Sequence, residues 1–529
     1  MKILVAEALA AEGLEILGRD HEVDVKLGLS AEEYHAILPE YDALVVRSQV
    51  KVDAAMIAAG TRLQVIGRAG VGVDNVDLAA APRAGIPVVN APTGNTIAAA
   101  EMTLALMYAV ARKVAAADAS VRRGEWKRNQ FAGRELRGKT LGIVGLGKIG
   151  MAVADRARAM EMKLLGSDPF VTADQAANHG IELVTLEEML PRVDVLTLHV
   201  PKNKATTGMI GALELARMKK DAIVLNVARG GVVDEAALAA ALRDGVIGGA
   251  GIDVYPTEPP KEMPLLDAPN TVLTPHLGAS TAEAQVAVAE EASLQVLDVL
   301  DGRPARYAVN APLLTPETAR AIAPYLPLAE TLGRFFAQFT RAAVSTMTLE
   351  VAGELASHDV TPLHAAMLRG LLGGTTTERV NLINAAGIAK ARGITVVERK
   401  TPDAGQFASL VTVSGEVAGA SRRVAGTLSN GEQRLTALDD YEVEMAPAPV
   451  MLVTRHQDRP RMMGRIGLTL GEMDINISAM HLGRSAPRTD AFMLLALDDA
   501  VPEPVAARIR AMDGVIDIWV VDLAGASES

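Results

Sequence analysis

Short apolar runs alternate with amphipathic stretches throughout the first three hundred residues of the chain. The first five runs have the length and aliphatic content of buried strands, with helical patterns between them. They lie at 3–6, 23–27, 43–46, 65–68 and 88–89. Strands that alternate with helices form parallel sheets, because each helix carries the chain back to the start of the next strand. The pattern predicts a first α/β unit over residues 1–97.

A second alternating set follows a long helical pattern at 98–121. Its predicted strands share the same short, apolar character and lie at 141–144, 162–167, 195–199, 222–226, 249–253 and 271–273. A helical pattern at 281–300 then leads back to the first unit. We therefore predict two lobes, a substrate-binding lobe of 1–97 with 281–312 and a nucleotide-binding lobe of 98–280. Ligands of such sheets bind beyond the carboxyl ends of the strands.

The last third of the chain has a different pattern. Residues 313–447 mix strands with helices, including a helical pattern at 328–339, and 448–529 have the order strand, helix, strand, strand, helix, strand. Proline-containing segments mark the boundaries, at 303–304, 310–312 and 447–449. The fold class predicted is α/β, with a two-lobed, doubly wound, Rossmann-like catalytic part followed by an α+β intervening domain and a βαββαβ domain.

Composition narrows the classes of function. The 529 residues are 49% hydrophobic and 3% aromatic, which is typical of globular domains with aliphatic cores. A net charge of −12 argues against nucleic acid or an anionic membrane as the partner. The absence of cysteine excludes disulfides and thiolate chemistry, and no metal site is expected. With no signal peptide and no long apolar span, we expect a cytoplasmic protein.

A glycine motif predicts a dinucleotide site. Gly145, Gly147 and Gly150 form G-x-G-x-x-G directly after the predicted strand at 141–144, and Asp168 ends the next strand. The glycines permit a tight turn, close approach of the backbone to a pyrophosphate, and close packing of helix on strand. A carboxylate at Asp168 accepts hydrogen bonds from the adenosine ribose and repels a 2′-phosphate, so the cofactor expected is NAD and not NADP.

Two other interpretations of glycine patterns were weighed. A glycine-rich strand-to-helix turn that binds nothing is the structural alternative to the dinucleotide site. Residues 133–140 match the pattern of an ATP-binding P-loop, but they precede a strand instead of following one. We therefore reject a P-loop.

Three polar residues follow successive predicted strands of the second lobe: Arg229, Glu258 and His276. Each alone is more typical of a surface charge, a loop cap or a structural histidine, but their shared place after strands of one sheet favours a catalytic group. His276 suits the base that takes a hydroxyl proton, and Glu258 suits a partner that orients its ring. Arg229 suits an anchor for a carboxylate, which predicts a 2-hydroxy acid as substrate.

Residues 1 to about 312 resemble the D-isomer-specific 2-hydroxyacid dehydrogenases, and more closely the phosphoglycerate dehydrogenases among them. The motifs that carry the resemblance lie at 67–75, 90–96, 145–150, 226–231 and 274–281. The resemblance implies oxidation of 3-phospho-D-glycerate by NAD, the entry to L-serine synthesis, with Arg229, Glu258 and His276 as the catalytic residues. It also implies further residues around the cofactor: Val71, Lys148, Ile149, Val200, Val227, Ala228, Arg229, Asp253, His276, Gly278 and Ala279.

A phosphorylated substrate needs extra donors at the far end of the cleft. Arg47 and Arg68 end predicted strands of the first lobe, Asn95 suits the hydroxyl and carboxylate end, and Arg128 is a further candidate beside Trp126. In the resembling family the loop around Trp126 lies at a dimer interface, so Arg128 is expected to serve the neighbouring subunit of a homodimer or homotetramer. Ordinary surface salt bridging is the alternative for these arginines.

The C-terminal domain resembles the ACT domain, a small-molecule regulatory module, through residues 455–460 and 474–477. Residues 313–447 resemble the intervening domain of long phosphoglycerate dehydrogenases. The resemblance implies an L-serine effector between paired domains, with Asp458 and Asn476 as contacts. Arg461 stands where the family usually has glycine, which puts serine inhibition in doubt. A dimerisation module without an effector is the alternative.

Two further hypotheses about function were considered. A reductase of glyoxylate or hydroxypyruvate belongs to the same class and differs in its indifference to the phosphate. A catalytically silent sensor of NADH or an amino acid belongs to another class, and the presence of Arg229, Glu258 and His276 together argues against it.

Overall fold

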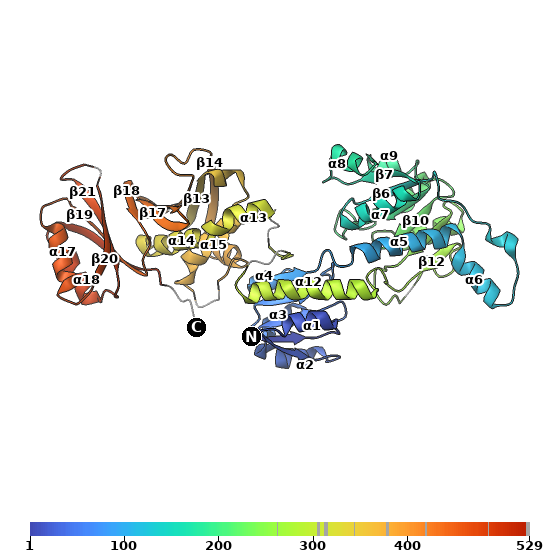
Figure 1. Ribbon diagram of the computed structural model, residues 1–529, viewed down its shortest axis with the longest axis horizontal. Coiled ribbons are helices and arrows are strands. Elements are labelled where there is room, and N and C mark those ends of the chain that lie inside the picture. The colour runs from blue at the N-terminus through green and yellow to red at the C-terminus, as the bar shows by residue number, and fades with distance from the viewer. Residues whose placement is uncertain are drawn as a thin grey trace.

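The computed structural model describes residues 1–261, 263–303, 307–311, 316–342, 344–376, 380–417, 420–484 and 486–524. Within this part the chain forms four sheets of five, seven, six and four strands, which follow one another along the sequence. Figure 1 shows them as successive bodies, with the two N-terminal lobes on one side and the C-terminal domains on the other. The prolines at 304 and 312, predicted to lie in a linker, fall outside the described residues.

The first lobe is a five-stranded parallel sheet in the order β2-β1-β3-β4-β5. Its strands are β1 (Lys2–Val5), β2 (Glu22–Val25), β3 (Ala43–Val46), β4 (Val65–Arg68) and β5 (Val88–Asn90). Helices α1 (Ala11–Leu17), α2 (Ala31–Ile37), α3 (Ala54–Ala59) and α4 (Ala80–Arg83) connect them. The predicted strands are confirmed. All but β2, which is partly exposed, are mostly buried apolar runs of the kind that stand out in the sequence.

Helix α12 (Ala282–Leu300) completes the first lobe from a distant part of the sequence. It packs on α1, β4 and β5 (Figure 1). The contact is close at two glycines. A Cβ at Gly13 would lie 2.8 Å from the Cβ of Ala289, and one at Gly67 would lie 2.5 Å from Val296. Helix α12 therefore lies close against both α1 and the sheet of the first lobe.

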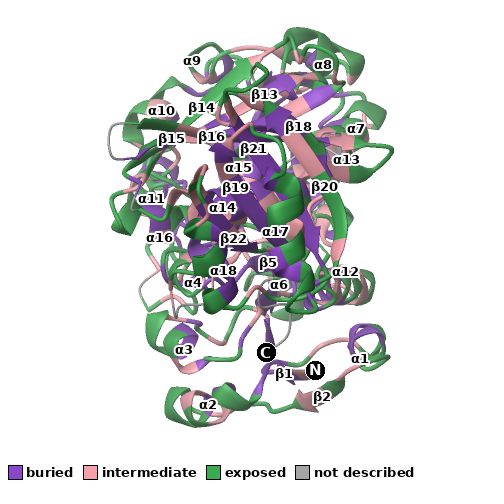
Figure 2. Cartoon of the chain, turned by 90° about the vertical axis from the view of Figure 1, so that its left-hand side faces the viewer, coloured by how far each residue is buried: buried purple, intermediate pink, exposed green. Residues whose placement is uncertain are grey.

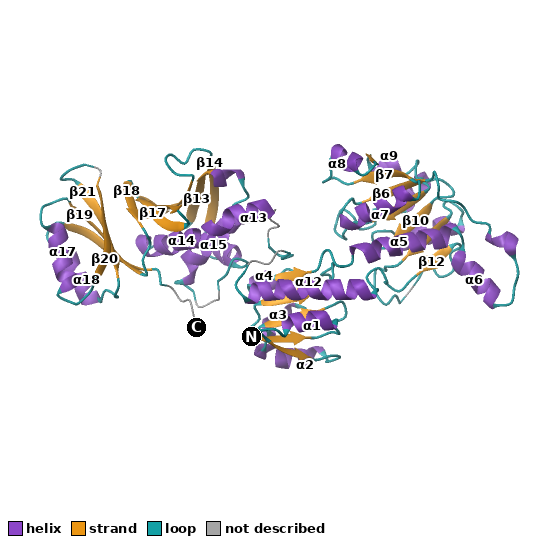
Figure 3. Ribbon diagram, viewed as in Figure 1, coloured by secondary structure: helices purple, strands orange, loops and turns teal. Residues whose placement is uncertain are grey.

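The second lobe is a seven-stranded parallel sheet in the order β12-β11-β10-β9-β6-β7-β8. Its strands are β6 (Thr140–Val144), β7 (Lys163–Ser167), β8 (Ile181–Leu183), β9 (Val195–Leu198), β10 (Ile223–Asn226), β11 (Gly249–Ile252) and β12 (Thr271–Leu273). Helices lie against the sheet (Figure 3), and the side chains between helices and strands form two apolar cores. The helices are α5 (Thr96–Ala111), α7 (Lys148–Ala159), α8 (Ala173–Asn178), α9 (Leu186–Met189), α10 (Ala212–Arg217) and α11 (Glu235–Arg243). This is the doubly wound arrangement that the sequence predicted.

The single helix predicted at 98–121 is wrong in one respect. The chain forms α5 and then α6 (Val114–Arg122), with a break at Lys113. Lys113 has the left-handed conformation, with φ of 53°, which an α-helix cannot continue. The alanine-rich sequence around the break contains no glycine or proline, so the helical pattern runs across it.

The intervening domain is a six-stranded sheet in the order β14-β13-β15-β16-β17-β18. Its strands are β13 (Thr346–Gly353), β14 (Thr395–Thr401), β15 (Ser409–Val417), β16 (Ala420–Ser429), β17 (Glu432–Leu438) and β18 (Tyr441–Met445). Helices α14 (Leu326–Thr340) and α15 (Thr361–Gly373) pack together and α14 lies on the sheet, while α13 (Pro316–Ile322) and α16 (Ala385–Ala391) flank them. The predicted helix at 328–339 is confirmed as part of α14.

The C-terminal domain has the predicted βαββαβ order: β19 (Val450–Gln457), α17 (Met462–Gly471), β20 (Ile477–Arg484), β21 (Asp490–Leu497), α18 (Glu503–Arg510) and β22 (Val515–Asp522). Its antiparallel sheet has the order β20-β21-β19-β22. One face packs on α17 and α18. The other packs on the intervening domain, where Phe339 of α14 contacts Trp519 with ring centroids 4.9 Å apart. The two central strands, β19 and β21, are therefore largely buried (Figure 2).

No helix among the described residues is long and apolar enough to cross a membrane.

Candidate active site

The glycine turn after β6 gives each glycine a different surrounding. Gly145 has φ of +92°, and a Cβ there would lie 2.5 Å from the carbonyl oxygen of His199. A Cβ at Gly150 would lie 2.1 Å from the carbonyl oxygen of Gly145. At Gly147, the residue that directly precedes α7, a Cβ would meet no described atom within 4 Å. The first and third glycines are thus required by packing, and the second leaves open space at the helix N-terminus, where a pyrophosphate fits.

Asp168 follows β7 and holds the glycine turn. Its Oδ2 accepts the backbone N–H of Leu146 at 2.8 Å, and its Oδ1 accepts the N–H of Phe170 at 2.8 Å. The carboxylate therefore stands beside the glycine motif, at the position expected for the ribose acceptor. The residues present fit a dinucleotide.

The other residues expected around the cofactor lie on the loops that surround this turn. Lys148 and Ile149 begin α7, Val200 follows β9, and a Cβ at Gly145 would lie 2.9 Å from the side chain of Val200. A Cβ at Gly278 would lie 3.1 Å from the side chain of Val227. The loops after several strands therefore meet at the carboxyl edge of this sheet, where Ala228 and Ala279 also lie. Val71 follows β4 of the first lobe, next to Gly72, whose added Cβ would lie 2.1 Å from Nη2 of Arg229.

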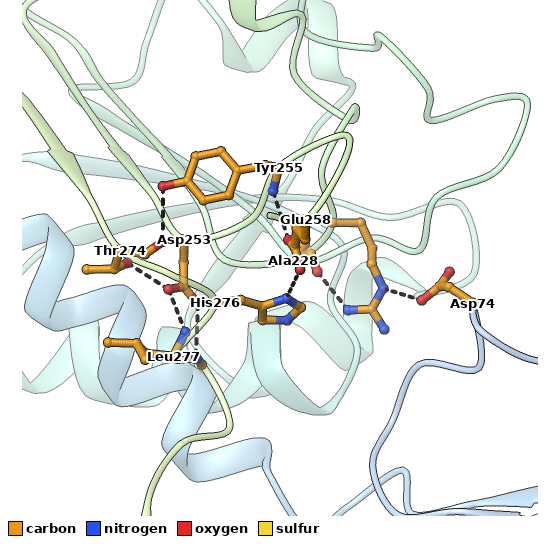
Figure 4. A network of polar contacts seen from close by, with 10 residues as sticks. Asp74, Ala228, Asp253, Tyr255, Glu258, Thr274, His276 and Leu277 are labelled. Atoms are coloured by element: carbon orange, nitrogen blue, oxygen red, sulfur yellow. Dashed lines mark hydrogen bonds and ion pairs between the residues drawn. The ribbon is translucent and has the colours of Figure 1, made fainter. Parts of the chain in front are cut away.

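His276 and Glu258 form a pair after β12 and β11. The Nδ1 of His276 lies 2.6 Å from Oε2 of Glu258, while Oε1 of Glu258 accepts the backbone N–H of Tyr255 at 2.9 Å. Figure 4 shows the imidazole directed at the carboxylate. Since an ionised carboxylate only accepts, the bond assigns the proton to Nδ1 and leaves Nε2 with a free lone pair. The two side chains are 47% and 35% exposed, so this lone pair is open to a ligand.

Asp253 builds the loop that presents His276. Asp253 is fully buried. Its carboxylate accepts three hydrogen bonds, from the Thr274 hydroxyl at 2.6 Å and from the backbone N–H groups of Leu277 at 2.7 Å and Gly278 at 2.8 Å (Figure 4). His276 between these donors has φ of 57°, a strained conformation for histidine. Sequence analysis placed Asp253 only near the cofactor. Its place directly after a strand, like the other site residues, was the available signal for a larger role.

Arg229 follows β10 on a turn closed by Asn226, whose Nδ2 donates to the carbonyl oxygen of Arg229 at 3.0 Å. The Nη1 of Arg229 donates to the carbonyl oxygen of Ala228 at 2.7 Å, and its Nε lies 3.2 Å from Oδ2 of Asp74. A Cβ at Gly230 would lie 1.9 Å from the backbone of Tyr255, so the Arg229 turn packs against the segment that carries Glu258. The structure thus brings the regions of all three candidate catalytic residues together.

Asp74 is a site residue that sequence analysis missed. It lies in the loop after β4 of the first lobe, and Asn90 holds that loop by donating to the carbonyl oxygen of Val71 at 2.6 Å. Asp74 falls within a motif quoted for the resemblance, but nothing in the sequence indicates that its partner is an arginine of the other lobe.

Arg68 lies near this pair, and Arg68 and Asn95 both have buried polar atoms without a partner among the described residues. The Nε of Arg68, the Oδ1 of Asn95 and the hydroxyl of Thr96 are buried without a hydrogen-bond partner among the described residues. Desolvation, followed by the charge of Arg229, lowers the pKa of Arg68 to about 10. A buried guanidinium with an unpaired N–H is a favourable place for an anion, because the ligand supplies the missing acceptor and charge.

Arg47 follows β3 and borders a cavity of about 580 Å³ in the first lobe, together with Glu7, Gln49 and Lys51. Its Nη1 lies 3.3 Å from the carbonyl oxygen of Ala8. The Glu7 carboxylate is 9% exposed and accepts the backbone N–H groups of Arg47, Gln49 and Val50 at 2.8 to 3.1 Å. The Glu7 carboxylate therefore binds the backbone of the loop and not the Arg47 side chain, which leaves the guanidinium available to a ligand.

Arg128 lies apart from the other substrate candidates. It belongs to a short 3-10 helix, Arg128–Phe131, beyond α6 at the outer edge of the second lobe (Figure 1). Within the described residues no hydrogen bond or ion pair joins it to Arg47 or Arg68. Trp126 beside it is 80% exposed. Arg128 therefore belongs to a different lobe from Arg47 and Arg68, which lie at the ends of first-lobe strands.

The two candidate effector residues lie at opposite ends of the C-terminal sheet. Asp458 follows β19 and pairs with Arg484 at the end of β20, with 3.1 Å between Nη1 and Oδ2. Asn476 precedes β20, and its Nδ2 donates to Asp498 at 2.6 Å. Because β19 and β20 both run antiparallel to β21, the two residues are separated by the length of β20, about 25 Å. One chain alone does not bring them together.

Arg461, the residue that departs from the family pattern, precedes α17 with φ of 76°. It therefore adopts the left-handed conformation that glycine takes without strain.

No group of three or more metal-ligating side chains occurs in the described ranges.

Two family models match the chain. The model of the D-isomer specific 2-hydroxyacid dehydrogenase NAD binding domain matches residues 104–278, and that of the D-3-phosphoglycerate dehydrogenase intervening domain matches residues 321–439. The first covers the glycine motif and the segments of Arg229, Glu258 and His276.

Similar proteins extend over nearly the whole chain. A D-3-phosphoglycerate dehydrogenase of Synechocystis is 46% identical over 99% of this chain and 95% of its own length. One of Archaeoglobus fulgidus is 42% identical over 99% of this chain and all of its own length. Among solved structures, a Thermus thermophilus protein is 38% identical, with a TM-score of 0.54 over 58% of this chain and all of that chain.

Proposed function

The chain belongs to the D-3-phosphoglycerate dehydrogenases, within the D-isomer-specific 2-hydroxyacid dehydrogenase family, and from this membership we propose its reaction. It is an NAD-dependent oxidoreductase that converts 3-phospho-D-glycerate to 3-phosphohydroxypyruvate, the first step of L-serine synthesis. The observation that carries the mechanism is the pair of His276 and Glu258 on the same edge of the sheet as the Arg229 turn.

His276 is the base. As the substrate alcohol becomes a carbonyl, its carbon loses hydride and its hydroxyl loses a proton to Nε2 of His276. The nicotinamide of bound NAD supplies the acceptor for the hydride. Glu258 holds the proton on Nδ1, and its negative charge stabilises the imidazolium that forms.

Arg229 anchors the substrate. A guanidinium binds a carboxylate through two parallel N–H groups, and one N–H close to the reacting carbon polarises the developing carbonyl. The buried, unpaired N–H of Arg68 and the unpaired Oδ1 of Asn95 lie ready for the remaining polar groups of the substrate. Arg47 follows β3 and borders the cavity of the first lobe, which suits binding of the phosphate at the far end of the substrate.

The assembly we propose is a homodimer or homotetramer in the cytoplasm. Trp126 is 80% exposed, and Val114 and Val121 of the preceding α6 are 53% and 56% exposed; several large apolar side chains exposed in one stretch of the chain favour burial against a second copy. In such an assembly Arg128 of one chain completes the substrate site of the next. Two copies are also needed to bring Asp458 and Asn476 into one L-serine site, which gives the C-terminal domain its regulatory, ACT-like role.

The test is turnover monitored at the nicotinamide absorbance band. We expect 3-phosphoglycerate with NAD to be oxidised far more efficiently than glycerate or lactate, and hydroxypyruvate and glyoxylate to be poor substrates in the reverse direction. Equal efficiency with and without the phosphate would replace the proposal by a general 2-hydroxyacid dehydrogenase. The His276→Ala variant is expected to bind NADH normally and to lose turnover.

A further inference from the structure

An ion pair joins the two lobes at the candidate active site. Arg229 belongs to the loop after β10 in the second lobe, and Asp74 belongs to the loop after β4 in the first lobe. Their Nε and Oδ2 atoms are 3.2 Å apart, and Figure 4 shows the Asp74 loop reaching toward the arginine from a separate part of the fold. The guanidinium proposed to bind the substrate carboxylate therefore already binds a carboxylate of the protein.

The surroundings of Arg229 leave little of its donor surface free. Its Nη1 donates to the carbonyl oxygen of Ala228, which removes one N–H from use by a ligand. A Cβ at Gly72 would lie 2.1 Å from Nη2 of Arg229 and 2.8 Å from Oδ2 of Asp74. The pair thus lies directly on the backbone of Gly72, in space that any side chain there would fill. Asp74 lies against the Nε end of the edge formed by Nε and Nη2, which is the edge that suits bidentate binding.

The charges near the pair explain why a carboxylate is stable at this place. Arg68 is close enough for the charge of Arg229 to lower its pKa, and the charge of Asp74 acts in the opposite direction. Asp74 therefore offsets repulsion between two guanidinium groups. A bound substrate carboxylate would offset the repulsion between the two arginines in the same way. The site can therefore exchange one anion for another while the positive charges of the arginines stay balanced by a negative charge.

We propose that Asp74 is a specificity-determining residue that occupies the carboxylate position of Arg229, so that the substrate carboxylate binds by taking its place. The inference rests on the proposed role of Arg229 as the substrate anchor. An uncharged alcohol has no group to exchange for Asp74 and is excluded, while every carboxylate ligand binds against this competition. Asp74 therefore increases the preference for anionic over uncharged ligands and lowers the affinity for carboxylate ligands.

The test measures affinity for oxalate, a dicarboxylate that cannot be oxidised at a hydroxyl carbon. Titration calorimetry of the full-length protein saturated with NADH compares wild type with Asp74→Asn. Since Asp74 is 70% exposed, its competition is that of a surface ion pair, and removal should tighten oxalate binding roughly two- to fivefold. Glu12→Gln, a matched loss of one negative charge on α1 of the same lobe, should leave the affinity unchanged.

Two more variants keep the result interpretable. Asp74→Glu retains the charge and should bind oxalate as wild type does. In an Arg229→Lys background, Asp74→Asn should change the oxalate affinity by a smaller factor, because the guanidinium for which Asp74 and oxalate compete is absent. Unchanged or weaker oxalate binding in Asp74→Asn would overturn the proposal and make Asp74 a support for Arg229 instead.

Failure of this inference is distinct from failure of the proposed reaction. If wild type does not turn over 3-phosphoglycerate, the reaction is wrong, whereas the ratio of oxalate affinities still decides whether Asp74 competes for Arg229.

Discussion

Replacement of Glu258 offers a test in which the smaller chemical change should do the greater damage. Glu258 has two neighbours, the backbone N–H of Tyr255 on Oε1 and Nδ1 of His276 on Oε2, at 2.9 and 2.6 Å. In the catalytic tautomer both neighbours are donors, and a carboxylate accepts from both. Glutamine offers one accepting oxygen and one donating amide group. It satisfies both neighbours only if His276 gives up the proton on Nδ1.

The magnitude follows from the two ways in which the pair fails. Glu258→Ala removes a hydrogen bond to a charged group, worth about 1.5–3 kcal/mol, and leaves both imidazole tautomers accessible. At about 1.4 kcal/mol per tenfold, kcat should fall roughly 10- to 150-fold. Glu258→Gln also stabilises the tautomer whose Nε2 carries a proton and cannot accept another. The comparable amide substitution in a serine protease triad costs about 10⁴ in kcat. Because this pair is partly exposed, we expect a loss of about 10³.

The assay is steady-state oxidation of 3-phosphoglycerate with NADH binding measured in parallel. Since Glu258 acts through His276 and does not touch the substrate, KM and NADH affinity should stay within about twofold of wild type in both variants. Glu258→Asp should restore part of the activity. Glu214→Gln is a matched control, because Glu214 accepts a backbone N–H at a helix start elsewhere in the same lobe. If the glutamine variant is the more active of the two, the tautomer argument is refuted.

Three further outcomes are expected. Asp168→Ala should reduce the preference for NAD over NADP roughly tenfold, by loss of charge-assisted hydrogen bonds to the ribose; an unaltered ratio of kcat/KM for the two cofactors would remove Asp168 from the site. Arg461→Gly should raise the free energy of unfolding of the C-terminal domain by about 1 kcal/mol, because φ of 76° strains arginine and not glycine, whereas Arg459→Gly in the same loop should lower it in denaturant titrations. Burial lowers the pKa of His199 to about 4, so the unfolded chain binds the extra proton between about pH 6.5 and pH 4. The free energy of unfolding should therefore decrease as the pH is lowered across that window. His199→Gln should make this decrease smaller, and an equal slope in the variant would exclude His199 as its source.

The parallel strands and the glycine turn could be predicted because their causes are local. A buried parallel strand is a short apolar run, and a turn with φ of +92° at Gly145 needs a residue without a side chain. The break at Lys113 could not be predicted in this way. The helical pattern is continuous there, although α5 has many buried residues and α6 buries only Ser120, a difference in packing that the pattern does not show.

The candidate site divides along the same line. Arg229, Glu258 and His276 were found because each follows a strand of one sheet, and the carboxyl ends of parallel strands share an edge. Asp74 was missed because its partner belongs to another lobe, and charge pairing across a cleft leaves no trace in residue spacing. The separation of Asp458 from Asn476 likewise depends on strand direction, which the order of elements alone does not fix.

The packing of α12 on the first sheet constrains the order in which a newly made chain matures. Val296, which is buried against Gly67, is synthesised about two hundred residues after the last strand of its sheet. At a translation rate of about 5–20 residues per second, the face of β4 and β5 that packs on α12 stays without that helix for roughly 10 to 40 seconds. During that interval the second lobe emerges complete, so the domain encoded first is the one that finishes later, and nascent chains halted before residue 282 should expose an apolar surface that chaperones recognise.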